Sequence, residues 1–182
     1  MINTNNSLRE KSIVFIGFMG VGKTTVGQLV AKKLFRSFVD IDQEIEKEYN
    51  MPTSQIFKLI GEKAFREKEK ETISNYCTQK LKIISLGGGA FLQKDTRDIC
   101  LKNCIVFYLD VSWKSWKERI NILIDSRPVL QGRSIQEIEE LFSERKDIYS
   151  LHHSKLNTDN SNVEEIADYI IESLKLAWEL YD

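Results

Sequence analysis

The sequence has few of the residues that characterise disordered, fibrous or linker-rich chains. Only 2 of its 182 residues are proline and 9 are glycine, which argues against disorder and against a collagen-like structure. The apolar runs, such as Ile13–Ile16, are far too short to span a membrane. Residues 1–11 are rich in Asn and Ser and lack the apolar core of a secretion signal. We therefore expect a cytoplasmic protein that does not insert into membranes.

Charge and cysteine content exclude further classes of protein. The chain has 26 Lys and Arg against 27 Asp and Glu, a formal net charge of −1. It therefore has no bulk positive field to attract nucleic acid or anionic lipid, and any anion must be bound by a local cluster. The three cysteines form no CxxC pair and have no neighbouring His to complete a zinc site. We interpret Cys77, Cys100 and Cys104 as buried, reduced thiols of a cytosolic protein.

Apolar, β-branched segments alternate along the chain with segments of helical period. The expected strands are residues 12–17, 37–41, 81–86, 105–109 and 155–158. The expected helices are residues 23–34, 43–79 with breaks near 50–52 and at Gly61, 95–101, 113–122, 135–149 and 163–180. This alternation predicts an α/β fold whose parallel sheet is covered on both faces. No repeat or linker divides the chain, so we expect one domain over residues 1–182.

A glycine-rich motif directly follows the first expected strand. It matches G-x-x-x-x-G-K-[ST] and reads Gly17-Phe18-Met19-Gly20-Val21-Gly22-Lys23-Thr24. Its glycines allow backbone N–H groups to converge on phosphate oxygens, and the following helix adds its N-terminal dipole. In such a loop Lys23 contacts the β- and γ-phosphates, and the Thr24 hydroxyl binds Mg²⁺. The alternative is a glycine-rich turn with a surface lysine.

The phosphate loop predicts a protein that uses ATP or GTP. No N-K-x-D motif for guanine is present, which favours ATP. The candidate nucleotide-binding residues in and beside the loop are Gly20, Val21, Gly22, Lys23, Thr24 and Thr25.

Two carboxylates and three glycines follow the next strands. Asp40 and Asp42 end the second strand, and Gly87-Gly88-Gly89 follows the third. The carboxyl ends of parallel strands share one edge of the sheet, so both segments are expected beside the phosphate loop. One carboxylate can hold a metal-bound water while the other orients a substrate hydroxyl; alternatively, Asp42 caps the following helix. The glycines expose backbone amides to a ligand, or form a plain tight turn.

Arginines at three places are suited to bind an anionic substrate. Arg66 lies in a charged helical segment, Arg127 precedes Pro128 in the irregular residues 121–133, and Arg145 lies on the next helix. Guanidinium groups bind carboxylates and phosphates through two parallel hydrogen bonds, and an irregular segment can deliver one as a lid. Each arginine alone is also compatible with a surface role, and Arg66 with an ion pair to a helical Glu.

Together these motifs resemble the shikimate kinase family, a nucleoside-monophosphate-kinase-like branch of the P-loop proteins. The resemblance covers residues 12–174 and rests on the phosphate loop and on Asp40-Ile41-Asp42, Phe65-Arg66-Glu67-Lys68-Glu69, Gly87-Gly88-Gly89-Ala90, Arg127-Pro128-Val129-Leu130 and Arg145 with Tyr149. It implies a three-layer α/β/α fold, a five-stranded parallel sheet in the order 2-3-1-4-5, a substrate-binding helical section at residues 42–80 and a lid at residues 121–134. Residues 1–11 lack a family counterpart and are expected to form a disordered tail.

The resemblance implies that the chain phosphorylates the 3-hydroxyl group of shikimate with ATP, in chorismate and aromatic amino acid biosynthesis, as a monomer. By the family pattern Asp42 binds the acceptor hydroxyls and acts as the base. Arg66 and Arg145 bind the shikimate carboxylate. The backbone of the glycine loop, Gly87, Gly88 and Gly89, holds a ring hydroxyl.

On the donor side, the resemblance gives Lys23 and Arg127 the task of neutralising the transferring phosphoryl group. Thr24 binds Mg²⁺ and Asp40 supports the ion through water. Arg119 and residues 157–160 contact adenine. Asp147, His153 and Asn157 depart from the usual family wording without touching an implied ligand contact.

Three other functions remain open at this stage. A kinase of another small polyol acid, such as gluconate, would share the phosphate loop, but Phe65-Arg66 and the three glycines favour shikimate. A noncatalytic regulatory module would be expected to lack Lys23, Asp42 or Arg127, which are all present. A P-loop ATPase that acts on another protein would be expected to carry an extra domain or a large apolar stripe.

Overall fold

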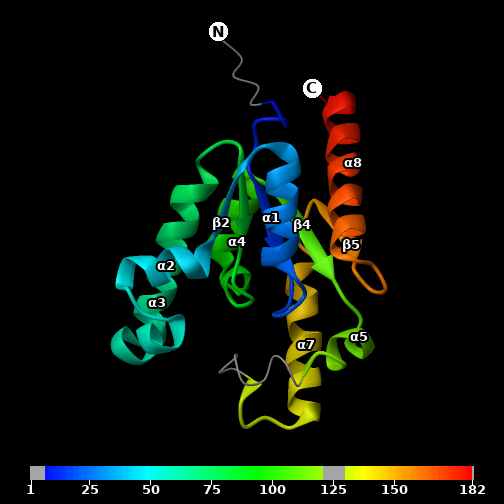
Figure 1. Cartoon of the computed structure of the whole chain (residues 1–182). Coiled ribbons are helices and arrows are strands. Elements are labelled where there is room, and N and C mark those ends of the chain that lie inside the picture. Colours follow the sequence, from blue (N-terminus) through cyan, green and yellow to red (C-terminus); the bar gives the residue numbers. More distant parts are fainter. Residues whose placement is uncertain (1–6, 121–129, 182) are drawn as a thin grey trace.

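The computed structural model describes residues 7–120 and 130–181, in which five strands form one parallel sheet (Figure 1). The sheet order is β2-β3-β1-β4-β5, and neighbouring strands pair in parallel throughout. The order that the family resemblance implied is thereby confirmed. The strands are β1 (Ile13–Ile16), β2 (Ser37–Asp40), β3 (Lys82–Ser85), β4 (Ile105–Asp110) and β5 (Ser154–Asn157).

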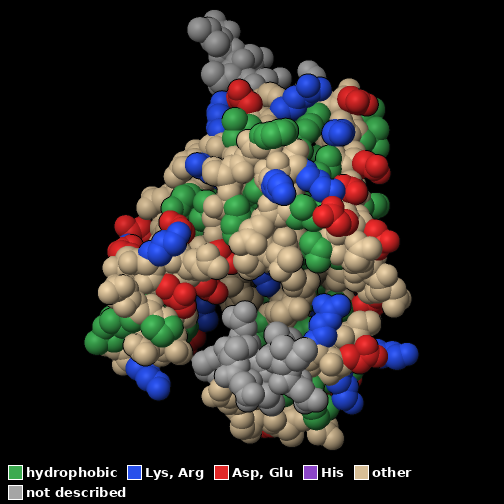
Figure 2. Space-filling model, in the orientation of Figure 1, with side chains coloured by type: hydrophobic (Ala, Val, Ile, Leu, Met, Phe, Trp, Pro, Cys, Tyr) green, Lys and Arg blue, Asp and Glu red, His purple; other side chains and the backbone are tan. Residues whose placement is uncertain are grey.

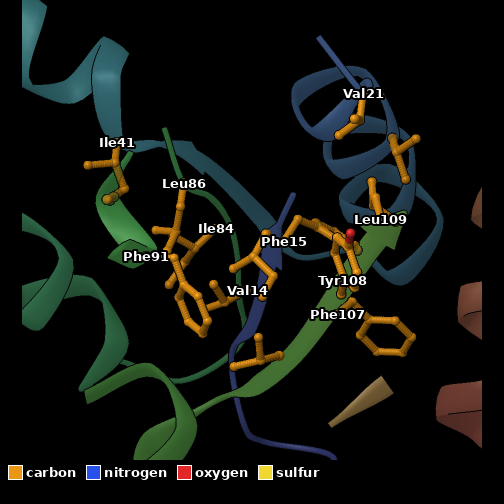
Figure 3. Close-up of a cluster of buried hydrophobic side chains, with 14 of the residues drawn as sticks. Val14, Phe15, Val21, Ile41, Ile84, Leu86, Phe91, Phe107, Tyr108 and Leu109 are labelled. Atoms are coloured by element: carbon orange, nitrogen blue, oxygen red, sulfur yellow. The ribbon is translucent and has the colours of Figure 1, made fainter. Parts of the chain in front are cut away.

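The core is built around the central strand β1. All four of its residues are fully buried, because β3 and β4 flank it and helices cover both faces. Figure 3 shows Val14 and Phe15 among apolar side chains of the neighbouring strands, including Ile84 and Phe107. Such continuous apolar runs are typical of strands that are buried on both faces. The core fixes the strand ends, and with them the loops that follow.

Helices connect the strands and cover the sheet. They are α1 (Lys23–Leu34), α2 (Ile41–Tyr49), α3 (Thr53–Cys77), α4 (Lys94–Asn103), α5 (Trp113–Lys117), α7 (Ile135–Tyr149) and α8 (Val163–Tyr181), with one 3₁₀ turn, η1 (Ala90–Leu92). Figure 1 shows α1 and α8 on one face of the sheet and α4 on the other. Beyond the carboxyl ends of the strands, α2 and α3 lie on one side and α5 and α7 on the other. The surface beside α2 and α3 is hollowed there, with Lys or Arg side chains at the back (Figure 2).

Several expected boundaries are confirmed, and others differ by a few residues. The helices expected at residues 23–34 and 135–149 have those bounds, and the expected break at Gly61 is present at φ 80°. The second strand, however, ends at Asp40, and α2 begins at Ile41. Asp42 is therefore helical and not on an extended segment, and Asp40 is the residue that caps α2, by accepting from Gln43 N at 3.3 Å.

The beginning of the described chain packs against the sheet. Leu81 N donates to Glu10 O at 3.0 Å, and Arg36 donates to the carbonyl oxygens of Lys11 and Arg9. Residues 9–11, which were expected to belong to a disordered tail, are therefore tied to the domain by hydrogen bonds. Among the helices of the described residues, none combines the length and apolar character that crossing a bilayer requires.

Candidate active site

The phosphate loop lies between β1 and α1, and its glycines are required by the geometry. A Cβ atom on Gly17 would lie 2.6 Å from the carbonyl oxygen of Leu109 on β4, which no side chain tolerates. Gly22, the residue before α1, has a φ of 94°, in the left-handed region. This path brings the loop amides to the N-terminus of α1, where backbone donors and the helix dipole favour an anion. Thr25, one of the candidate nucleotide ligands, is exposed.

Lys23 and Thr24 are the first two residues of α1. Lys23 contacts two carbonyl oxygens of the phosphate loop, and Thr24 contacts a carboxylate. Lys23 is buried, and its Nζ donates to Gly17 O at 2.9 Å and to Phe18 O at 3.0 Å. The Thr24 hydroxyl donates to Asp40 Oδ2 at 2.8 Å. The side chains predicted to bind Mg²⁺ are thus adjacent, and both supply the oxygen ligands that this ion prefers.

No group of three or more His, Cys, Asp or Glu side chains in the described part of the chain is arranged to hold a metal. Mg²⁺ does not require one, because it is usually bound by one or two protein oxygens, waters and substrate phosphates. Thr24 and Asp40 therefore fit Mg²⁺ that arrives with a nucleotide.

The glycine loop brings three parts of the site together. A Cβ atom on Gly87 would lie 2.8 Å from Asp42 Oδ1, and one on Gly89 would lie 2.8 Å from Arg66 Nη2. A Cβ atom on Gly88 would lie 3.3 Å from the backbone N of Met19 in the phosphate loop. The glycines thus leave room for the side chains of Asp42 on α2 and Arg66 on α3. The structure places Asp42, Arg66 and the phosphate loop around one short segment.

Arg145 reaches this loop from α7. It is 9% exposed, and its Nη1 donates to Gly88 O at 3.3 Å. Its guanidinium carbon lies 5.5 Å from the centre of the Phe18 ring, and its Nε is buried without a hydrogen-bond partner among the described residues. Among the described residues no carboxylate lies within ion-pair distance of it. Burial lowers its pKa, but a guanidinium keeps its charge in proteins, so this buried cation is suited to bind an anion.

Arg66 forms an ion pair with a helical Glu, the alternative that the sequence analysis left open, but the partner is buried and not on a solvated face. Arg66 Nη1 lies 2.8 Å from Oε2 of Glu69, which is 1% exposed and also accepts from Gln93 Nε2 at 3.1 Å. Burial raises the pKa of Glu69 to about 7, although Arg66 acts in the opposite direction. The spacing of three residues on one helix was the available signal. The burial of Glu69, by contrast, could not be inferred from the sequence.

Tyr149 holds the same glycine loop. Its hydroxyl donates to Gly88 O at 2.5 Å from a side chain that is 1% exposed. Burial raises the pKa of Tyr149 to about 12, so it remains a donor at neutral pH. Two residues four apart on α7, Arg145 and Tyr149, therefore hold one carbonyl group.

The remaining predicted residues lie apart from this cluster or outside the described residues. Arg119 is exposed just after α5, and the stretch after β5 meets the start of that helix, where Ser112 N donates to Asp159 Oδ1 at 3.0 Å. Arg127 and most of the expected lid fall within residues 121–129, outside the described residues. Asp147, which departs from the usual family wording, lies within a regular α7. His153, the second departure, lies after α7, and its Nδ1 accepts from Val106 N at 3.0 Å.

Comparison with known proteins decides the family. A family model described as shikimate kinase matches residues 19–175. A shikimate kinase of Oceanobacillus iheyensis is 61% identical over 175 residues, which cover 96% of both chains. The chain belongs to the shikimate kinase family. It is therefore an ATP-dependent kinase, as the motifs predicted.

Other shikimate kinases support the same conclusion. The one from Bacillus subtilis is 59% identical over 175 residues, covering 96% of this chain and 94% of its own. The structure of shikimate kinase from Acinetobacter baumannii in complex with shikimate is 29% identical, with a TM-score of 0.85 over 92% of this chain and 94% of that one. A gluconokinase from Sinorhizobium meliloti shares the fold alone, at 16% identity and a TM-score of 0.60.

Proposed function

We propose that this shikimate kinase transfers the γ-phosphate of ATP to the 3-hydroxyl group of shikimate, giving shikimate 3-phosphate and ADP. The observation that carries the proposal is the buried Arg145, which has no carboxylate partner in the described residues and lies beside the phosphate loop. A buried cation of this kind is stabilised by an anionic ligand. The carboxylate of the acceptor supplies that anion within reach of the transferring phosphate.

The acceptor is held by side chains from three helices and by the glycine loop. Arg145 from α7 and Arg66 from α3 bind the carboxylate, with Glu69 holding the Arg66 guanidinium in place. The backbone of Gly87, Gly88 and Gly89 holds a ring hydroxyl, and Asp42 binds the reacting hydroxyl. This assignment is supported by the 2.8 Å separations that Cβ atoms on Gly87 and Gly89 would have from Asp42 and Arg66.

ATP binds on the other side of Gly88. Gly20, Val21, Gly22, Lys23, Thr24 and Thr25 bind its phosphates, Arg127 from the lid adds positive charge, and Arg119 with residues 157–160 binds adenine. Thr24 and Asp40 hold Mg²⁺, which when bound neutralises phosphate charge. Lys23 exchanges its bonds to the carbonyls of the loop for bonds to the phosphates.

The chemistry requires positioning and one proton transfer. Asp42 accepts the proton of the 3-hydroxyl as the oxygen bonds to the γ-phosphorus, and the bond between that phosphorus and the ADP oxygen breaks. Lys23 and Arg127 stabilise the charge on the transferring group. Closure of the lid excludes water, so that ATP is not hydrolysed.

We also propose that the enzyme acts as a monomer in the cytoplasm. The described chain brings Asp42, Arg66, Arg145 and the phosphate loop together without a second copy. Its three cysteines are free and buried, as expected for a reducing compartment.

Acceptor identity is tested by ADP release with MgATP and either shikimate, gluconate or no acceptor. We expect release with shikimate only. Release with gluconate would favour the alternative sugar-acid kinase, and release without an acceptor would favour an ATPase.

The carboxylate subsite is tested with shikimate methyl ester, in which the anion is removed. Charge-assisted hydrogen bonds contribute roughly 1.5–3 kcal/mol each, so the ester should have a KM at least about a hundredfold higher. Arg145→Met should raise the KM of shikimate and reduce the ratio of the KM of the ester to that of shikimate. An unchanged ratio of the two KM values would show that Arg145 does not contact the carboxylate.

A further inference from the structure

A buried tryptophan from another helix donates a hydrogen bond to the phosphate loop. Trp116 on α5 is fully buried, and its indole Nε1 donates to the carbonyl oxygen of Met19 at 2.7 Å. Met19 is itself 6% exposed, so this carbonyl is shielded from water. Unpaired buried carbonyl groups are costly, and the indole N–H is therefore an important partner for this part of the loop.

Aromatic rings fix the position of the indole. The Trp116 ring lies 5.0 Å from Phe18, edge to face, and 5.4 Å from Trp113, in a stacked arrangement. Phe142 of α7 contacts Phe18 at 5.0 Å and Trp116 at 5.9 Å. Contacts of this kind hold a ring in one orientation. The direction of the N–H bond toward Met19 is consequently set by packing on three sides.

Met19 is the point at which the phosphate loop meets the glycine loop. A Cβ atom on Gly88 would lie 3.3 Å from Met19 N and 3.5 Å from Met19 Cβ. A shift or rotation of the Met19 peptide therefore moves the loop that binds ATP relative to the loop that binds the acceptor.

The Met19 carbonyl accepts from a different kind of donor than the carbonyls of the two residues before it. The carbonyls of Gly17 and Phe18 accept from Lys23, whose ammonium turns to the phosphates when ATP binds. Trp116 has no charge, and its only side-chain N–H group already donates to Met19 O. Its hydrogen bond can persist throughout binding and catalysis.

We propose that Trp116 is a positioning residue for phosphoryl transfer: its indole N–H fixes the Met19 carbonyl and so keeps the phosphate loop in the conformation that binds ATP. The proposal rests on the proposed function in one respect, that this loop binds ATP. It adds a residue outside the loop, on the helix that precedes the lid, whose hydrogen bond is required for full nucleotide affinity.

The test compares Trp116→Phe with Trp178→Phe. Phenylalanine at position 116 retains an aromatic ring but removes the N–H. Trp178 is the matched control, because in the part of the chain that the structure describes its own Nε1 is buried without a hydrogen-bond partner. Dissociation constants for MgATP and for shikimate are measured separately by titration calorimetry, together with the melting temperature.

We expect Trp116→Phe to raise the Kd of MgATP about five- to tenfold, the range expected for one lost hydrogen bond, and to leave the Kd of shikimate within about twofold. The control should change neither. An unchanged MgATP affinity in a folded Trp116→Phe protein overturns the proposal. So does an equal loss of affinity for both ligands that follows a lower melting temperature, because a merely structural role predicts that result.

Two further proteins separate the possible failures. Benzothienylalanine at position 116 has the size of tryptophan but no N–H, so it should reproduce the loss of MgATP affinity without a cavity; wild-type affinity in that protein overturns the proposal. Lys23→Ala tests the proposed function itself. If it binds MgATP as tightly as the wild type, the loop is not the nucleotide site and the proposal for Trp116 fails with it.

Discussion

The buried Glu69 leads to a prediction on stability and pH. Its carboxyl group is 1% exposed, and burial raises its pKa to about 7 from an ordinary value of 4.5. Because the pKa is raised in the folded state, the folded chain keeps a proton that the unfolded chain loses between about pH 4.5 and pH 7. The contribution of this group to stability is therefore fully present below pH 4.5 and declines as the pH rises to about 7.

Glu69→Gln removes the group that titrates while keeping its shape. One pKa unit corresponds to about 1.4 kcal/mol, so the difference between the two pKa values changes the free energy of unfolding by at most about 3 kcal/mol. The unfolding free energy of the variant relative to the wild type should therefore increase by about 2–3 kcal/mol between pH 5 and pH 8. The loss of the Arg66 ion pair is included in this figure, because the pKa already contains the attraction of Arg66.

The assay is urea unfolding at pH 5, 6, 7 and 8, followed by tryptophan fluorescence. Glu62→Gln is the control, since Glu62 pairs with the same arginine at 3.7 Å but its side chain is 73% exposed. Because an exposed ion pair contributes at most about 1 kcal/mol to stability, the difference between Glu62→Gln and the wild type should be small throughout. If the Glu69→Gln difference is independent of pH, or decreases as pH rises, the argument from burial is wrong.

Two further predictions concern the glycine loop. Gly87→Ala places a Cβ atom 2.8 Å from Asp42 Oδ1, and displacement of that short side chain should lower kcat at least about tenfold while the Kd of MgATP, measured by titration, stays unchanged. Tyr149→Phe removes the 2.5 Å hydrogen bond to Gly88 O, which keeps its bond from Arg145. The variant should lose about 0.5–1.5 kcal/mol of unfolding free energy in urea and have a higher KM for shikimate; unchanged values would show that this hydroxyl does not hold the loop.

Local sequence signals predicted the parts of the fold that depend on neighbouring residues. The phosphate-loop motif placed the start of α1 at Lys23, and Gly61 marked the break in α3. Alternation of strands and helices gives the fold class but leaves the strand order open, and that order came from the family resemblance. Asp42 was expected on an extended segment because the pattern did not show that Asp40 already caps α2.

The residues that sequence reasoning missed at the candidate site, Trp116 and Glu69, depend on tertiary packing. Trp116 donates to a residue 97 positions away, and neither its spacing nor its neighbours indicate that partner. Glu69 lies in a strongly charged segment, where burial of one carboxylate among several cannot be read from residue type. In both cases the tertiary packing, and not the local pattern, determines the role of the side chain.

If the acceptor binds Arg145 as proposed, this cation, which has no carboxylate partner among the described residues, links the supply of substrate to the amount of folded enzyme. A ligand that binds only the folded state stabilises it in proportion to the logarithm of its concentration above the Kd. In the proposed function the acceptor carboxylate provides an anion for this cation, so the protein without acceptor retains more of the cost of burying it. Proteolysis and thermal inactivation, which act on opened molecules, are consequently slowest when the acceptor is abundant. The lifetime of the enzyme is then expected to follow the supply of its substrate.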